Sequence, residues 1–412
     1  MKDTSHELSK HDIAAFFNAY DTAIHQDPYP FYTKMLQDFP AYYLEERDTW
    51  IVSKHEYVQF ILKSPKLIRE RSSLDGEPVV DDPPRWRNIQ ELVQDWMLFR
   101  DPPTHTRLRS HVAYAFTPKT LEQSKPQIRS IAESLAADMQ KETNPEILQQ
   151  FAFPLPVMVI ADMLGVPKEE RDVFKKWSNS LARLLDVAIL SEEHLDEGDL
   201  AASEIRAYFR QLVKERKKNP KEDIISELIH VQNHEHQLSE EELINNCILL
   251  LVAGHETTVN LIGNGMKLFI ENPSSYNLLH QNPELIPSAV EEVLRYEGPV
   301  QFTNRAAGED IILGDTLIKR GKEVIVGLGA ANRDPAIFND PNHFDITRKK
   351  NRHLAFATGP HFCIGAPLAR LEAITAFQVL LQHFPALRLA DPSPVWRDQI
   401  LFRGLEALHV KF

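Results

Sequence analysis

The sequence predicts a mainly α-helical fold with small β regions, an α+β protein forming one domain over residues 1–412. Helical signals dominate from about 104 to 290. Between 299 and 327 the pattern changes to short apolar runs near glycines, which is typical of strands. One predicted helix, beginning at Ser239 and ending near 271, would reach roughly 45 Å. A helix that long with an apolar middle has to cross the core of a large domain.

The composition excludes several classes of protein. Of 412 residues, 43% are hydrophobic, and 59 Asp and Glu against 46 Lys and Arg give a formal net charge of −13. This acidic balance argues against a nucleic-acid partner, because nucleic-acid binders usually carry a basic surplus. Two cysteines, Cys247 and Cys363, are too few for a disulfide-stapled secreted scaffold.

The sequence also predicts a soluble, cytoplasmic protein with no membrane partner. The N-terminal residues are polar, without the apolar segment of a signal peptide. No apolar run approaches the ~18 residues that cross a bilayer.

The first part of the chain predicts two helices around a pair of strands. The helices occupy the two ends of residues 27–65, and the short strands lie at Ala41–Leu44 and Thr49–Ser53. A helix is expected after Thr117-Pro118, because threonine caps a helix and proline suits its first turn. The acidic run 192–199 is interpreted as an exposed loop between two helices, because charge runs are usually solvated.

The second half has a clear helix start and a clear β region. Ser239 and Glu242 form the capping-box pattern S-x-x-E directly before the long apolar helix. The stretch 328–362 is expected to be mostly irregular, with a last helix beginning near Cys363 or Ile364. The expected strands are Val300–Thr303, Ile311–Leu313 and Glu323–Val326, with glycine turns at Gly308, Gly314 and Gly321.

Residues 356–365, F-A-T-G-P-H-F-C-I-G, place one cysteine in a loop that leads into the last helix. A thiolate at a helix N-terminus is stabilised by the helix dipole and by free backbone N–H groups. Such a sulfur suits a nucleophile or a metal ligand. A buried structural thiol is the commoner fate of a lone cysteine, so the loop alone leaves these alternatives open.

The pattern F-x-x-G-x-x-x-C-x-G resembles the haem-ligand loop of the cytochrome P-450 family, without a gap. The resemblance implies haem b, iron protoporphyrin IX, with the Cys363 thiolate as axial ligand and Cys363 as the metal-binding residue. It implies that Gly359 and Gly365 let the backbone approach the macrocycle and that Phe356 covers the sulfur. Ala357 departs from the pattern, because glycine is usual there, and we expect a slight shift of the loop.

Four further cations match family positions that bind the haem propionates. His105 and Arg109 lie four residues apart in D-P-P-T-H-T-R-L-R, which resembles the family's D-P-P-x-H-x-x-x-R. Arg305 matches a strand arginine of the family, and His361 a propionate-binding residue of the cysteine loop. Cations suit a dianionic, otherwise apolar cofactor, although each residue taken alone could be an ordinary surface cation.

The long helix carries A-G-H-E-T-T at residues 253–258, which resembles the family's oxygen-binding segment. The resemblance implies that Ala253 or Gly254 leaves room for O2 over the iron. It also implies that Thr257 places a hydroxyl beside the oxygen and that Glu256 relays protons. The alternative is a helix with an internal glycine and solvent-facing polar residues, but a buried acid–alcohol pair is costly without a use.

Glu292 and Arg295 form the family's E-x-x-R pattern, in which the two side chains share a helix face. The pattern alone is weak evidence, since such surface pairs are common. The resemblance implies a buried structural pair joined by an arginine that precedes the cysteine loop, for which Arg348 is the candidate. The expected role of the three is to hold the cysteine loop in place.

The resemblance implies a P-450 fold, with haem between the long helix and the cysteine-loop helix, and a monooxygenase of the soluble bacterial type. The expected reaction is hydroxylation or epoxidation of a lipophilic small molecule, such as a macrolide or polyketide, a fatty-acyl chain, a terpenoid or a drug-like compound. The substrate pocket is expected to include apolar residues from several regions. These are Met97, Leu98, Leu249, Val252, Val300, Phe302, Leu401 and Phe402.

Electrons are expected from a separate ferredoxin or flavodoxin with its reductase, because the chain has no cysteine set for a cluster and no room for a reductase. The basic run 348–353 would suit an acidic donor, although it could also be a solvated turn. A monomer is expected.

Two other functions stay open. A haem-thiolate peroxygenase is the nearer one, although Glu256 and Thr257 count against it. The other is a non-catalytic haem-binding sensor, in which a catalytic oxygen helix would have no purpose. A metal hydrolase is excluded because no H-E-x-x-H pair occurs among the 17 histidines.

Overall fold

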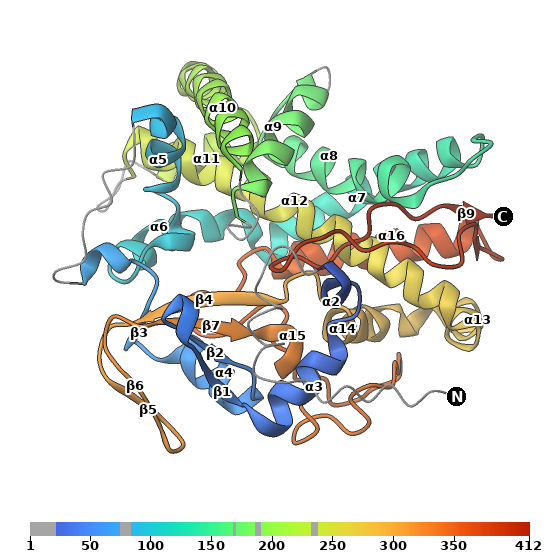
Figure 1. Ribbon diagram of the computed structural model, residues 1–412. Coiled ribbons are helices and arrows are strands. Elements are labelled where there is room, and N and C mark those ends of the chain that lie inside the picture. The colour runs from blue at the N-terminus through green and yellow to red at the C-terminus, as the bar shows by residue number, and fades with distance from the viewer. Residues whose placement is uncertain (1–21, 75–83, 168–169, 186–190, 232–237) are drawn as a thin grey trace.

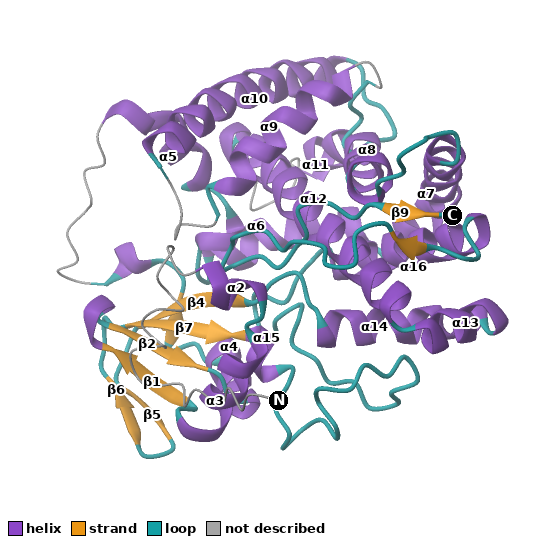
Figure 2. Cartoon of the chain, turned by 45° about the vertical axis from the view of Figure 1, so that its right-hand side comes forward, coloured by secondary structure: helices purple, strands orange, loops and turns teal. Residues whose placement is uncertain are grey.

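The computed structural model describes residues 22–74, 84–167, 170–185, 191–231 and 238–412 (Figure 1). The polar N-terminal residues, from which the lack of a signal peptide was predicted, lie outside the described ranges. Figure 2 shows most of the strands gathered on one side of the molecule, the last strand apart from them near the C-terminus, and helices forming most of the rest. The expected class, mainly α with small sheets, is confirmed.

The α-helices are distributed along the whole chain. They are α2 Thr22–Gln26, α3 Tyr29–Asp38, α4 His55–Lys63, α5 Arg87–Val93, α6 Thr104–Val112, α7 Pro118–Met139, α8 Pro154–Met163, α9 Arg171–Arg183, α10 Glu192–Lys218, α11 Ile224–Val231, α12 Glu240–Glu271, α13 Pro273–Gln281, α14 Ile286–Tyr296, α15 Leu328–Ala331 and α16 Ala366–His383. Short 3-10 turns occupy Glu45–Arg47, Arg71–Ser73, Pro84–Trp86, Met97–Phe99, Ala113–Phe116 and Pro283–Leu285, and a π turn occupies Leu148–Ala152.

Helix α12 crosses the molecule (Figure 1) and packs against α8, α9, α10, α14 and α16. Its start is the predicted capping box, in which the Glu242 N–H donates to Ser239 Oγ at 3.0 Å and the Ser239 N–H donates to Glu242 Oε2 at 2.8 Å. The predicted start of α7 is also confirmed, because Thr117 caps it by accepting a hydrogen bond from the Thr120 N–H.

The interpretation of residues 192–199 as a loop is wrong, because they form the first two turns of α10. Ser191 caps this helix, and Glu192 and Glu193 place negative charge at its positive end. Asp196 pairs with Arg85, and Asp199 accepts hydrogen bonds from the backbone of residues 88 and 89. Partners distant in sequence therefore order a charged run that looked solvated.

The main sheet has five strands in the order β1-β2-β7-β4-β3, with β2 and β7 parallel and the other pairs antiparallel. The two predicted N-terminal strands and the later β region are confirmed. Val300 lies outside β4 and instead forms an isolated bridge with Phe402. The strands are β1 Ala41–Leu44, β2 Thr49–Val52, β3 Leu67–Ile68, β4 Phe302–Ala307, β5 Ile311–Leu313, β6 Thr316–Ile318, β7 Glu323–Gly327, β8 Arg388–Leu389 and β9 Val410–Lys411.

The start of the last helix differs slightly from its predicted position. The last helix, α16, begins at Ala366, two to three residues later than expected, because Gly365 occupies the cap position. Among the described residues, no helix has the length and apolarity needed to cross a membrane.

Candidate active site

The cysteine loop folds so that the thiol of Cys363 lies against the N-terminus of α16. Burial raises the pKa of the Cys363 thiol, while hydrogen bonds from the backbone N–H groups of Gly365 and Ala366 and the positive charge of Arg109 act in the opposite direction. A half-buried sulfur that faces backbone donors and cations suits a ligand to a positive metal ion, which replaces the proton.

Backbone hydrogen bonds and two left-handed residues shape this loop. The Cys363 N–H donates to Phe356 O at 3.0 Å, and the Ala357 N–H donates to Leu354 O at 2.8 Å. Ala357 has φ +57° and Gly359 has φ +77°. The family's usual glycine at 357 therefore corresponds to a real conformational demand, which alanine meets at a cost.

Gly359 is required for a second reason. A Cβ at this position would lie 2.3 Å from the carbonyl oxygen of Leu62 at the end of α4. The structure thus gives Gly359 a contact with α4, and its expected approach to the macrocycle stays a prediction. At Gly365, by contrast, the one described atom near such a Cβ is Cys363 Sγ, at 4.0 Å, so this side of the loop is open.

Phe356 is half-buried at the start of the loop, and the guanidinium of Arg370 lies 4.6 Å from its ring centre. Arg370 is held by two hydrogen bonds to Glu291, of 2.7 and 2.9 Å. Burial would raise the pKa of Glu291, but hydrogen bonds from His353 and Arg370 lower it to about 2. The aromatic ring beside the cysteine loop is thus supported by a firm ion pair.

The predicted propionate-binding residues come together, and Arg69 joins them. The rings of His105 and His361 lie 4.1 Å apart. His105 Nδ1 and His361 Nε2 are buried and find no hydrogen-bond partner among the described residues. Burial, with help from neighbouring cations, lowers the pKa of His105 to about 4 and that of Arg305 to about 9.

This cation cluster has little negative charge of its own. Asp101 Oδ1 lies 3.9 Å from His361 Nε2, beyond hydrogen-bond distance, and Asp101 Oδ2 accepts from the Arg69 and Glu70 N–H groups. Arg109 donates to the carbonyl of Phe362 at 2.7 Å, which ties α6 to the cysteine loop. Unpaired buried histidine nitrogens beside several arginines fit the two carboxylates of haem.

Sequence reasoning missed Arg69. It follows the short strand β3 and contacts the cluster because β3 pairs with β4, the strand of Arg305. Its side chain donates to Asn304 O at 2.8 Å and to Leu98 O at 3.0 Å. The signal would have been the pairing of these strands, which no local pattern contains.

The middle of α12 has an open face. Ala253 and Gly254 are exposed although the residues before and after them are buried, and a Cβ at Gly254 would meet no described atom within 4 Å. Thr257 Oγ1 donates to Ala253 O at 3.0 Å. The openings at Gly254 and Gly365 belong to the helix and the loop between which the resemblance places haem, so the residues present fit the group.

Glu256 has a partner that the sequence did not indicate. Its Oε1 lies 3.1 Å from Nη1 of Arg397, near the C-terminus. The next residue toward the N-terminus, His255, is buried and hydrogen-bonds to Ser178 of α9 through Nδ1 at 3.0 Å. Both Glu256 and His255 line a cavity of about 410 Å³.

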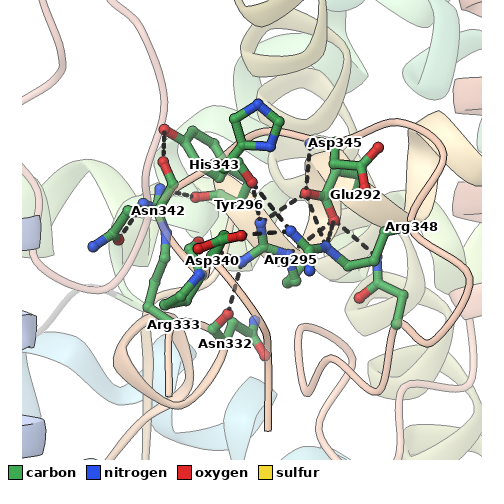
Figure 3. A network of polar contacts seen from close by, with 12 residues as sticks. Glu292, Arg295, Tyr296, Asn332, Arg333, Asp340, Asn342, His343, Asp345 and Arg348 are labelled. Carbon is green, nitrogen blue, oxygen red and sulfur yellow. Dashed lines mark hydrogen bonds and ion pairs between the residues drawn. The ribbon is translucent and has the colours of Figure 1, made fainter. Parts of the chain in front are cut away.

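The E-x-x-R pair and Arg348, its candidate third member, lie together in the structure (Figure 3). Glu292 and Arg295 are fully buried and joined by hydrogen bonds of 2.7 and 2.8 Å, and Arg348 Nε lies 3.1 Å from Glu292 Oε2. The guanidinium groups also donate to backbone carbonyls of the irregular segment. These belong to Asn332, Asn339, Pro341 and His343.

The eight expected pocket residues fall into several apolar groups. Met97, Leu98, Leu249 and Val252 pack in one cluster between α12 and the preceding helices. Phe302 and Leu401 pack in another cluster, near α3, while Val300 pairs with Phe402 in a bridge. None of the eight lines the 410 Å³ cavity, whose lining is largely polar. Their joint role in binding substrate stays a prediction.

Comparisons with known proteins identify the family of this chain. The family model of cytochrome P450 matches residues 16–399. The biotin biosynthesis cytochrome P450 of Bacillus subtilis (strain 168) is 41% identical over 389 residues, covering 94% of this chain and 96% of that protein. The polyketide biosynthesis cytochrome P450 PksS of the same organism is 38% identical over 406 residues, covering 96% and 98%.

The structural likeness is equally extensive. The crystal structure of P450BioI in complex with hexadec-9Z-enoic acid ligated acyl carrier protein has a TM-score of 0.88 at 40% identity, covering 95% of this chain and all of that one. The chain therefore belongs to the cytochrome P450 family. It is an oxidoreductase that incorporates oxygen, and its family implies haem with a cysteine thiolate ligand.

The backbone of the cysteine loop predicts opposite effects of two single substitutions. Ala357→Gly should stabilise the protein by about 0.5–1 kcal/mol, because it relieves the left-handed conformation of a residue with a Cβ. Gly359→Ala should destabilise it by about 2–4 kcal/mol, because strain adds to the clash with Leu62 O. Urea unfolding of the two variants checks both signs, and a destabilising Ala357→Gly would contradict the assigned backbone.

Glu292→Gln should destabilise the protein by about 3–5 kcal/mol, because two buried guanidinium groups lose their counter-charge. The matched control is Glu291→Gln, which removes a neighbouring but more exposed carboxylate and should cost less than half as much. Equilibrium unfolding of both variants provides the comparison. Equal losses would contradict the central position of Glu292.

Proposed function

We propose that the protein is a haem-thiolate monooxygenase that inserts one atom of O2 into a lipophilic small molecule. Each turnover consumes the substrate, O2, two electrons from a separate donor and two protons, and yields the oxygenated product and water. The observation that carries the proposal is the combination of a half-buried cysteine just before α16, an open small-residue face on α12 and a cluster of arginines and histidines that includes buried nitrogens unpaired among the described residues.

Each of the residues described above would have a distinct role in the reaction. Haem, when bound, supplies the iron that reduces O2 and transfers oxygen to the substrate. Cys363 would hold the iron, and His105, His361 and Arg305 would bind the propionates. On α12, the Thr257 hydroxyl would donate a hydrogen bond to O2, and Glu256 would pass protons toward it. The small residues Ala253 and Gly254 would leave the necessary space.

The electron donor would be a ferredoxin or a flavodoxin with its reductase. The basic run 348–353 offers less charge to such a donor than its sequence suggests. Arg348 is bound to Glu292, and His353 pairs with Glu291 at 3.0 Å. Lys349, Lys350 and Arg352 are exposed and would make the contact with an acidic donor.

Among the lipophilic substrates expected from the sequence, we favour a fatty-acyl chain. The solved structure described above contains hexadec-9Z-enoic acid attached to an acyl carrier protein. The apolar residues around Leu249 and Val252 suit a hydrocarbon chain. A polyketide is the second candidate, which the name of PksS supports.

The reduced protein with carbon monoxide should show the strongly red-shifted Soret band of thiolate ligation. Cys363→His should abolish this band, because it removes the thiolate. Cys247→Ala is the control, since Cys247 is buried in α12 and burial raises the pKa of its thiol to about 12. A red-shifted band that survives in Cys363→His would refute the proposed ligand.

Oxidation of hexadecenoic acid, free or bound to an acyl carrier protein, should require a ferredoxin or flavodoxin with its reductase. Omitting the donor while supplying hydrogen peroxide should lower product formation at least ~10-fold, because Glu256 and Thr257 serve a route that needs external protons. Product is measured by mass spectrometry. Equal or faster turnover with peroxide alone would favour a peroxygenase, and an absence of product under both conditions would favour a sensor.

A further inference from the structure

Two neighbouring asparagines, Asn245 and Asn246, interrupt the apolar first half of α12. Their side chains are 0% and 1% exposed, and the helix is buried all round from Leu243 to Val252. A buried amide is costly unless its polar groups find hydrogen-bond partners. Most of the hydrogen bonds of these two amides go to residues 91–97, at the end of α5 and the start of the 3-10 turn that follows it.

Asn246 binds the backbone of the turn that carries Met97. Its Nδ2 donates to Asp95 O at 2.8 Å, and its Oδ1 accepts from the Met97 N–H at 3.1 Å. The same Nδ2 donates to Glu242 O at 2.8 Å, one turn earlier in α12, which fixes the side chain on its own helix. One amide thus holds the backbone on both sides of Trp96.

Asn245 and α10 hold the preceding residues of this segment. Asn245 Nδ2 donates to Glu91 O at 2.9 Å and to Asp95 Oδ2 at 2.8 Å. Arg206 of α10 donates to the carboxylate of Glu91 at 2.7 Å. Residues 91–97 therefore have a fixed position relative to the first two turns of α12.

The far end of the segment reaches the cation cluster. Arg69, which joins the predicted propionate-binding residues, donates from Nε to Leu98 O at 3.0 Å. Met97 and Leu98 belong to the same apolar cluster as Leu249 and Val252, which precede the open small-residue face of α12. Met97 and Leu98 thus connect the face that would meet O2 with the cluster that would bind the propionates, and a substrate has to lie in this region to be oxidised.

We propose that Asn246 is a positioning residue for the substrate. By binding the backbone at Asp95 and Met97, it sets the place of the Met97 and Leu98 side chains and thereby decides which carbon of an acyl chain is oxidised. Its own three hydrogen bonds all go to backbone groups and use both of its N–H donors, so none is left for a substrate. The inference rests on the proposed monooxygenase function.

Asn246→Leu tests the proposal, because leucine is close in size, keeps the helix and removes the three hydrogen bonds. In the haem-loaded protein, the dissociation constant of hexadec-9Z-enoic acid, measured by the shift of the Soret band, should rise about five- to tenfold. KM should rise equally with kcat within about twofold of wild type, because a pocket wall binds the ground state and the transition state alike. The main product should give way to a mixture of neighbouring positions, because a small misplacement changes which carbon reacts.

The matched control is Tyr276→Phe, which also removes a buried hydrogen bond to a backbone carbonyl, that of Phe384. Tyr276 lies in α13, at the opposite end of the molecule from α5 (Figure 1). The control should lower stability towards urea but leave the dissociation constant and the product pattern within about twofold of wild type. An equal change in both variants would show that lost stability alters binding, which would overturn the proposal.

A double-mutant cycle tests whether Asn246 acts through Met97. Met97→Ala should itself weaken binding of the acid. Adding Asn246→Leu to Met97→Ala should then raise the dissociation constant by less than about twofold. Additive effects of the two substitutions would overturn the proposal.

Hydrogen exchange provides a measurement that does not depend on turnover. In haem-loaded Asn246→Leu, the amide of Met97, followed in peptides that cover residues 91–99, should exchange at least ~10-fold faster than in wild type. Unchanged protection of this amide would overturn the proposal. If wild-type protein with its donor oxidises no substrate, the proposed function fails, whereas the exchange result still tests the role of Asn246, so the two failures are distinguishable.

Discussion

The ion pairs of the buried Glu292 carboxylate with Arg295 and Arg348 link α14 to the irregular segment that precedes the cysteine loop. Residues 332–353 have almost no regular structure, so their carbonyl groups need donors from elsewhere. Arg295 and Arg348 supply those donors, and the carboxylate of Glu292 lies between them as their counter-charge. Asn332, bound by Arg295, in turn accepts the Leu354 N–H at 2.7 Å, where the cysteine loop begins. One carboxylate thus connects α14 to the position of the thiol.

The cation cluster shows how binding and folding are linked in this protein. His105 Nδ1 and His361 Nε2 are buried nitrogens without a hydrogen-bond partner among the described residues, and burial lowers the pKa of Arg305 beside them. Without an anion, such a group of side chains destabilises the fold. A dianionic ligand that binds the folded state alone would remove that cost and would thereby stabilise the fold.

The sequence predicted what local patterns encode. The start of α12 at Ser239, most of the short strands and the pairing of Glu292 with Arg295 follow from short motifs, and the structure contains them. Arg69, Arg397 and the helical start of residues 192–199 were missed. Each is ordered by a partner far away in sequence, so its role depends on the way the chain folds back and not on its neighbours.

The close contact of Gly359 with the carbonyl oxygen of Leu62 has a consequence for biosynthesis. The loop that bears the thiol rests on a helix made near the beginning of synthesis, while the loop itself lies close to the end of the chain. The parallel pairing of β2 with β7 joins the same two parts. The long segment between these two parts must therefore leave the ribosome before the surfaces can meet, and we expect the cofactor to be acquired only after the cysteine loop has been synthesised.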